Sequence, residues 1–209
     1  LATAADNLVV NLASVSGTSD VLGLEVVEFG DAGVTNEQLN FDAAGIETLN
    51  LKMSNTNAGR LLLDGVTATT GSTVTVNVSG AGVAELNSLS SSITNVVSTG
   101  TGALTIAAAD RTASAMTITG GEGGDSIAMR NSSDVLTGGL GTDTLNVSFG
   151  AILGGIEVNL GATDQVVSLN GSSNAAVQTG FENVNLSAFT GFGAVVTGST
   201  GANTIVGTT

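Results

Sequence analysis

The most regular feature of the chain is a triplet in which an Asn separates two aliphatic or Phe residues. Successive side chains of a β-strand point to opposite faces, so the two apolar residues of a triplet share one face and the Asn lies on the other. Clusters of Gly, Ser, Thr and Asn, which favour turns, separate the triplets. The pattern predicts many short strands, with triplets at 10–12, 39–41, 49–51, 76–78, 145–147, 158–160 and 184–186.

Other short apolar segments, bounded by the same turn residues, add to this set. The best candidate for a helix is 34–44, whose period is equally compatible with a loop and a strand. We expect further strands at 60–63, 73–78, 93–97, 103–107, 115–119, 165–169, 194–197 and 203–206.

A second recurrence indicates how these strands are arranged. Gly, an apolar residue and Glu precede predicted strands at 45–47, 155–157 and 180–182. Repeated units of this kind suggest stacked coils, in which each rung buries its apolar face on the next. Pro, which would remove a donor from the strand ladder, is absent. The sequence predicts an all-β fold, a parallel β-solenoid or β-roll of short stacked strands. A β-sandwich shares these features but does not need the 18-residue register described below.

The composition excludes several classes of catalytic and binding site. The 209 residues include 18 acidic and 4 basic ones, giving a net charge of −14, with no Cys and no His. These absences exclude thiolate nucleophiles, zinc–thiolate centres and Ser-His-Asp triads. So few basic residues argue against binding to nucleic acid or to an anionic membrane surface. The donors that remain are carboxylates, hydroxyls, amides and backbone carbonyls, which are the ligands of a hard cation such as calcium.

Residues 120–146 divide into three consecutive nonapeptides. The first and third, 120–128 and 138–146, match G-G-x-G-x-D-x-U-x, where U is aliphatic, at every specified position. The middle one keeps only Asp134 and the aliphatic residue in register. Asp125, Asp134 and Asp143 therefore follow one another at intervals of nine residues.

This segment resembles the repeats of the RTX family of secreted proteins. The resemblance implies a β-roll in which two nonapeptides form one coil, so that Asp125 and Asp143 lie on the same edge, one rung apart. Rungs are about 4.8 Å apart, and two carboxylates at that distance repel unless a cation lies between them or one is protonated. The implied site binds Ca2+ through the carboxylates of Asp125 and Asp143 and through the backbone carbonyls of Gly121, Gly123, Gly139 and Gly141.

The same geometry places Asp134 on the opposite edge. Its stacking neighbours would be Met116 and Ile152, neither of which can hold calcium, and Arg130 replaces a turn glycine. We therefore expect one well-formed site, with Asp134 at most a peripheral contributor. A degenerate repeat at 198–206 has Asn203 at the Asp position. Its simplest interpretation is a turn without metal, although repeats beyond the C-terminus could complete a site there.

The chain as a whole is similar in texture to lattice domains of bacterial S-layers, through its Ala-, Thr-, Val-, Asn- and Gly-rich strands and the sequence GIETLNL at 45–51. That resemblance implies a structural, non-enzymatic module on the bacterial cell surface, exported by type I secretion. It would fold with extracellular calcium and self-assemble through calcium-bridged contacts. Attachment to a cell-surface polysaccharide would use parts of a longer chain, of which this sequence reads as a fragment.

Two alternatives stay open at this point. One is an adhesin or filament repeat that binds a carbohydrate, ice or a host surface. The other is an accessory domain of a secreted hydrolase or lyase. In each case we expect three segments: a β-rich region at 1–119, the calcium-binding β-roll at 120–146 and further rungs at 147–209. Neither nucleic-acid binding nor membrane insertion is expected.

Overall fold

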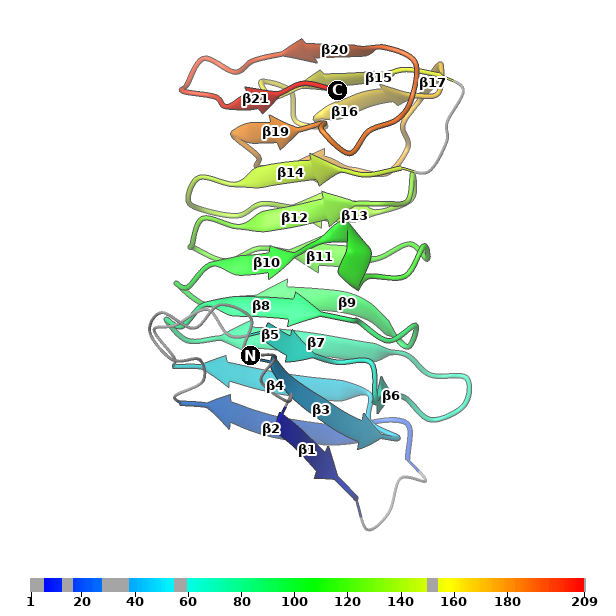
Figure 1. Cartoon of the computed structure of the whole chain (residues 1–209), viewed down its shortest axis with the longest axis vertical. Helices are drawn as coiled ribbons and strands as arrows, with labels where there is room; N and C mark the ends of the chain where they lie inside the picture. Colours follow the sequence, from blue (N-terminus) through cyan, green and yellow to red (C-terminus); the bar gives the residue numbers. More distant parts are fainter. Residues whose placement is uncertain (1–5, 13–16, 28–37, 55–59, 150–153, 209) are drawn as a thin grey trace, which may run out of the picture.

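The chain forms a parallel β-solenoid (Figure 1). A computed structural model describes residues 6–12, 17–27, 38–54, 60–149 and 154–208. Along most of this length, successive strands alternate between two sheets, so that two strands and two turns complete one coil. The coils stack along the long axis of the molecule, from β1 and β2 at one end to β20 and β21 at the other (Figure 1).

Sheet A extends along the whole solenoid and is parallel throughout. The short strand β6 (Val66–Thr67) also pairs with β3. In spatial order the main strands of sheet A are β1 (Asp6–Val10), β3 (Gln38–Ala44), β5 (Arg60–Leu62), β8 (Ala84–Asn87), β10 (Leu104–Ile106), β12 (Ser126–Met129), β14 (Thr144–Val147), β19 (Asn183–Asn185) and β21 (Ile205–Val206).

Sheet B is the second wall of the solenoid and is also parallel. Its strands are β2 (Val21–Val26), β4 (Thr48–Met53), β7 (Val74–Ser79), β9 (Ile93–Ser98), β11 (Thr117–Thr119), β13 (Val135–Thr137) and β18 (Gln178–Thr179).

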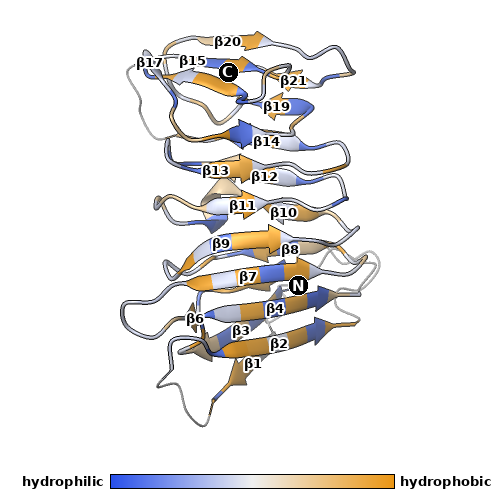
Figure 2. Ribbon diagram, turned by 180° about the vertical axis from the view of Figure 1, so that it is seen from behind, coloured by the Kyte–Doolittle hydropathy of each residue, from blue (hydrophilic) through white to orange (hydrophobic). Residues whose placement is uncertain are grey.

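The core lies between the two sheets and is built by the alternation of the triplets. Leu49 and Leu51 of β4 are 0% and 1% exposed, whereas Asn50 between them is exposed. Figure 2 shows the same alternation of apolar and polar residues along β4 and β7. The outward Asn side chains form ladders between rungs, because Asn77 Nδ2 donates to Asn50 Oδ1 at 2.8 Å. The strand pattern predicted by the triplets is thus confirmed, except at 10–12, where β1 ends at Val10. The pattern buries an aliphatic column inside the solenoid.

A small third sheet interrupts the regular coils near the C-terminus. After β14, the chain forms β15 (Ile156–Asn159), β16 (Val166–Leu169) and β17 (Ser172–Ser173) before it returns to sheet B at β18. These strands pair antiparallel with one another, and β15 also pairs in parallel with β20 (Ala194–Thr197). Two strands that are adjacent in sheet A, β14 and β19, are therefore 39 residues apart in sequence, because Leu145 pairs with Val184.

The helix considered for 34–44 is not formed where the structure describes it, since residues 38–44 are strand β3 and 34–37 lie outside the described residues. The helix assigned in the described part is the short 3₁₀ turn η1 (Ala108–Asp110). No helix of the described residues has the length and hydrophobicity to cross a membrane.

Candidate cation site

Three turns lie one above another where the chain passes from sheet B to sheet A, on the left in Figure 1. They are 120–125, 138–143 and 180–182, and they end in Asp125, Asp143 and Glu182. We call these turns the acidic edge. The pairing of Ser126 with Thr144, and of Thr144 with Asn183, places the three acids on consecutive rungs. The prediction that Asp125 and Asp143 lie on one edge, one rung apart, is confirmed.

Each acid of this edge accepts a backbone hydrogen bond from the preceding rung. Asp125 Oδ1 accepts from the Leu104 N–H at 2.7 Å, and Asp143 Oδ1 accepts from the Asp125 N–H at 2.7 Å. Glu182 Oε2 accepts from the Asp143 N–H at 2.8 Å. The acids therefore form a continuous column that connects four rungs, from Leu104 to Glu182.

The two aspartates of the column are buried, and no Lys or Arg side chain of the described residues pairs with them. Asp125 is 1% exposed and Asp143 is 0% exposed. Burial raises the pKa of Asp125, although hydrogen bonds from Leu104 and Gly121 oppose the shift. Burial also raises the pKa of Asp143 to about 6, and the negative charges of Asp125 and Glu182 add to the increase. The ionised column is thus unfavourable as it stands.

One buried oxygen of the column has no hydrogen-bond partner among the described residues. Asp125 Oδ2 accepts from the Gly121 N–H at 2.7 Å, four residues earlier in the same turn. Asp143 Oδ2 is buried and accepts no hydrogen bond. An unsatisfied buried carboxylate oxygen is costly, so a ligand that supplies positive charge at this point would stabilise the fold.

Glycines allow the turns of the acidic edge to approach closely. Gly139 and Gly141 have φ values of +115° and +120°, a conformation that favours glycine. A Cβ on Gly139 would lie 2.3 Å from the carbonyl oxygen of Gly121, and one on Gly141 would lie 2.3 Å from that of Gly123. The four glycines proposed as carbonyl ligands therefore form two stacked pairs, although Gly121 and Gly123 are not among the glycines with positive φ. Their role as ligands stays a prediction.

The first glycine of each nonapeptide lies beside both oxygen types that calcium uses. A Cβ on Gly138 would lie 2.0 Å from the Gly180 carbonyl oxygen and 2.7 Å from Asp143 Oδ2. A Cβ on Gly120 would lie 1.9 Å from the Gly138 carbonyl oxygen and 2.2 Å from Asp125 Oδ2. A carboxylate oxygen and a turn carbonyl oxygen therefore face the same point at two successive rungs. A side chain on either glycine would fill this space.

The glycine stacking extends beyond the nonapeptides. A Cβ on Gly121 would lie 2.3 Å from the Gly100 carbonyl oxygen, and a Cβ on Gly100 would lie 2.4 Å from that of Gly80. The sequence carries a signal for this arrangement that we did not use, since G-x-G recurs at 80–82, 100–102, 121–123 and 139–141. The nonapeptides are thus the acidic part of a longer column of glycine turns.

Glu182 is the member of the site that sequence reasoning missed. It belongs to the third Gly-apolar-Glu recurrence, which we used only as a sign of repeating strands. The insertion that carries β15, β16 and β17 separates it by 39 residues from Asp143, so nine- and 18-residue spacings do not find it. Its position directly before a strand with an Asn triplet is the signal that it shares with Asp143.

Asn203 lies at the end of the same column. The pairing of Val184 with Ile205 places it beside Glu182, and its Nδ2 donates to the Glu182 carbonyl oxygen at 2.8 Å. Its Oδ1 accepts from the Ser199 N–H at 2.7 Å. Among the described residues, the Asn203 side chain therefore bonds to the backbone of its own turn and of the Glu182 turn.

Asp134 lies on the opposite edge and is 0% exposed. As expected, Met116 is its neighbour on one side, because Thr117 pairs with Val135. The prediction that residue 152 is its neighbour on the other side is wrong. Leu136 pairs with Gln178, so the register position falls at Ala176, because the inserted sheet intervenes. Ile152 itself lies outside the described residues. Asp134 forms an ion pair with Arg111 at 2.6 Å.

The acidic edge offers oxygen ligands but not a complete carboxylate cage. Within the described ranges, no group of three or more Asp or Glu side chains is arranged so that it could hold a metal ion. Any cation at this edge would need the turn carbonyls in addition to Asp143. Comparison with models of protein families, with curated proteins and with solved structures finds no match to the chain.

Proposed function

We propose that the chain is a structural module of a secreted bacterial cell-surface protein of the S-layer type, which folds and assembles with calcium. The observation that carries this proposal is the column of the buried Asp125 and Asp143 and the half-buried Glu182, in which Asp143 Oδ2 has no partner among the described residues. A divalent cation is the simplest group that would balance this charge. The RTX-like nonapeptides support the choice of calcium and of the extracellular space.

The basic residues of the sequence do not supply this charge. Lys52 pairs with Glu25 and Arg60 with Glu85, both on the N-terminal half of the solenoid. Arg111 pairs with Asp134, and Arg130 donates to backbone carbonyls near it. These four are all of the Lys and Arg residues of the chain. The column must therefore obtain positive charge from the solvent, or take up a proton.

The donors at the column fit calcium in kind. Calcium binds carboxylate and carbonyl oxygens in flexible geometry. Asp143 would contribute Oδ2 and Gly180 its carbonyl oxygen, because both lie beside the position that a Cβ on Gly138 would take. The Gly138 carbonyl oxygen lies beside Asp125 Oδ2 at the neighbouring rung. When bound, the ion would neutralise the column and hold three rungs together.

The solenoid also suits assembly. In the described part of the chain, β1, β2, β20 and β21 each pair on one side only, so both ends have open ladder edges. Large apolar side chains are exposed there, among them Val21 at 62% and Val195 at 61%. Open edges of this kind are templates for pairing with further strands. They support self-association, through which a lattice would be built.

The charge of the chain supports a switch between two compartments. A net charge of −14 opposes compaction by self-repulsion. At the low calcium of a cytosol this would favour the unfolded chain that type I secretion exports. Extracellular calcium would then neutralise the acids and drive folding, because ions that bind the folded state alone stabilise it.

The proposal is tested by calcium titration of the 209-residue chain, followed by calorimetry and far-UV circular dichroism. We expect saturable binding with a gain of β-structure or of thermal stability, and loss of that response in Asp143→Asn. The matched control is Glu122→Gln, which removes the same charge from an exposed position in a turn of the acidic edge. An identical calcium response in wild type and Asp143→Asn would contradict the proposed site.

Assembly is tested separately by light scattering and electron microscopy at millimolar calcium. Ordered sheets or filaments that dissolve in chelator are the expected result. A calcium-bound monomer at high concentration would contradict the lattice role and favour an adhesin or accessory domain.

A further inference from the structure

The opposite edge of the same coils contains a cation of its own. This edge consists of residues 107–116, between β10 and β11, and of the turn 130–134, between β12 and β13, and we call it the arginine edge. Arg111 donates from Nη2 to Asp134 Oδ1 at 2.6 Å and from Nη1 to Asp134 Oδ2 at 2.9 Å. Both side chains are 0% exposed. The two charges therefore meet in a bidentate pair inside the protein.

The carboxylate of Asp134 is fully used. Beyond the two bonds from Arg111, Oδ1 accepts from the Met116 N–H at 2.9 Å. Oδ2 accepts from the N–H groups of Arg130 and Asn131, each at 2.9 Å. Five donors on two oxygens exceed the roughly four lone-pair sites of a carboxylate. Asp134 therefore has no oxygen available for a metal ion, in contrast to Asp143.

The guanidinium of Arg111 is surrounded by oxygens. Apart from the two carboxylate oxygens, Nη1 donates to the Ala128 carbonyl at 2.6 Å and Nη2 to the Ser114 carbonyl at 3.3 Å. Two carboxylate oxygens and two backbone carbonyl oxygens thus converge on one positive charge. This is the mixture of oxygens that a calcium site uses, and the three segments that supply them belong to neighbouring rungs.

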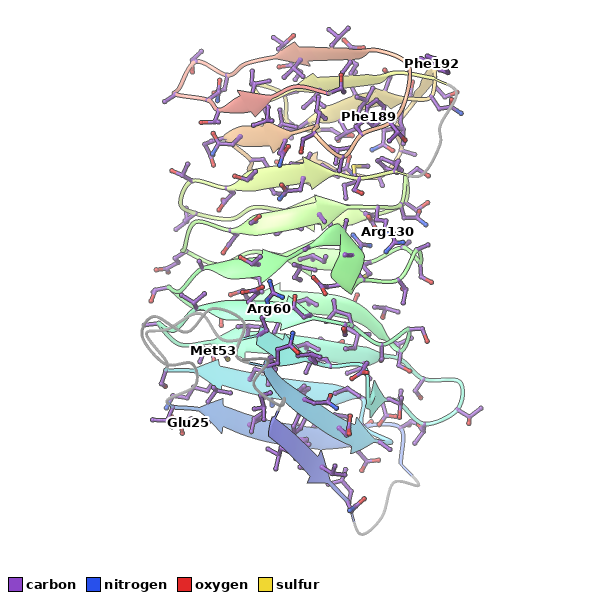
Figure 3. The ribbon with its side chains drawn as sticks, viewed as in Figure 1. Glu25, Met53, Arg60, Arg130, Phe189 and Phe192 are labelled. Carbon is purple, nitrogen blue, oxygen red and sulfur yellow. The ribbon has the colours of Figure 1, made fainter. Side chains whose placement is uncertain are left out.

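Arg130 holds the two halves of this edge together. Its Nη1 donates to the carbonyl oxygens of Ala108, at 2.7 Å, and of Arg111. Figure 3 shows Arg130 at the turn beside β13, on the edge opposite the glycine turns. The residue that departs from the nonapeptide pattern at a glycine position therefore fastens the turn to the segment that carries Arg111.

We propose that Arg111 is a built-in cation that occupies, at Asp134, the place that a divalent ion would take. The arginine edge then folds without metal, and Arg111 excludes divalent ions from it. The middle nonapeptide retains its Asp because this carboxylate binds Arg111. The inference goes beyond the proposed function, since it holds whether or not the acidic edge binds calcium.

The test is site-resolved hydrogen exchange in EDTA and in 10 mM calcium on the 209-residue chain carrying Asp143→Asn, because this substitution removes the calcium response proposed for the acidic edge. With Arg111 in place in this background, the amides of Met116 and Asn131 should exchange at the same rate in both solutions. In Arg111→Ala, which leaves space beside a buried carboxylate, these amides should lose at least tenfold protection in EDTA and recover most of it in calcium.

The control is Arg111→Ala combined with Asp134→Asn, which has the same cavity without the buried charge. Its amides should show no response to calcium. Calcium-dependent protection of Met116 and Asn131 in Asp143→Asn with Arg111 in place would overturn the proposal. Equal protection of the same two amides in EDTA and in calcium in the Arg111→Ala variant would also overturn it. If the single variant does not fold in EDTA, its failure to fold in calcium as well would also overturn it.

Discussion

The two edges of the solenoid both bury Asp side chains, but they differ in whether a basic residue pairs with the carboxylate. At both edges, a buried Asp near the end of a turn accepts backbone N–H groups from its own turn or from the neighbouring rung. At the arginine edge, Arg111 balances Asp134, and every carboxylate oxygen is satisfied. At the acidic edge, Asp125, Asp143 and Glu182 stack without a basic partner, and one oxygen is left over.

The comparison indicates which feature would make a nonapeptide of this chain depend on an external ion. The Asp itself does not decide this, because Asp134 and Asp143 both lie in register and are both buried. What differs is whether the fold brings an Arg to the carboxylate. One folded core thus combines an edge whose buried carboxylate is paired with Arg111 and an edge whose acids have no basic partner, although Arg111 Nε is itself buried without a hydrogen-bond partner among the described residues.

The largest effect is expected from neutralising Asp134. Asp134→Asn leaves the guanidinium of Arg111 buried without its counter-charge, which costs about 3–5 kcal/mol in comparable buried pairs. Asp143→Asn removes an unpaired negative charge instead, so it should leave stability in EDTA unchanged or raised. Urea unfolding in EDTA measures both. Equal destabilisation by the two variants would contradict the difference between the edges.

A smaller effect is expected from crowding the glycine column. Gly139→Ala would place a Cβ 2.3 Å from the Gly121 carbonyl oxygen and should cost about 2–3 kcal/mol. Gly71→Ala is the matched control, because Gly71 also has positive φ, +89°, but no atom lies within 4 Å of its Cβ position. If thermal unfolding shows the same loss for both, backbone strain rather than close stacking explains the glycines.

A still smaller effect is expected from pH, because the stability of the fold should depend on the titration of Asp143 at the acidic edge. The pKa of Asp143 is raised to about 6 in the folded chain, against an ordinary value of 3.8. At pH 5 the folded state keeps a proton that the unfolded state has lost, so in EDTA the protein should be more stable at pH 5 than at pH 7. The expected difference is about 1–2 kcal/mol, and it is lost as pH rises through 6.

Calcium and substitution should both abolish this pH dependence. Calcium keeps the column ionised, and Asp143→Asn removes the titrating group. Urea unfolding at pH 5 and pH 7 measures the effect under each condition. A wild-type stability that increases from pH 5 to pH 7 in EDTA is the contradicting result.

The smallest effect is expected from an exposed ion pair. Lys52 and Glu25 are 2.8 Å apart, but their side chains are 60% and 49% exposed. Lys52→Ala should leave the free energy of unfolding almost unchanged, since solvent and salt screen such pairs. A loss as large as that of Asp134→Asn would show that burial does not set the strength of ion pairs in this chain.

Much of the fold could be predicted from the sequence, because a strand with one buried face alternates apolar and polar residues along the chain. All eight additional strands expected from apolar segments, such as β7 and β16, are present within one or two residues. Asp125 and Asp143 were placed correctly because the coil between them has its regular length of 18 residues. Where coil length varied, prediction failed.

The partners of these acids illustrate that limit. Glu182 reaches the acidic edge only after an inserted sheet, and no local spacing reveals that insertion. Arg111 lies 23 residues before Asp134, in the irregular segment 107–116 that also contains η1. Both contacts are decided by the length of a coil, whereas the sequence pattern specifies only which face each strand buries.

The most direct measurement is the hydrogen exchange of two sets of wild-type amides as calcium is added to a chelated sample. Leu104 and Asp125 donate to the acidic column, whereas Met116 and Asn131 donate to Asp134. The expected result is that calcium slows exchange of the first set more than exchange of the second. Equal slowing of both sets, or no change in either, would contradict it.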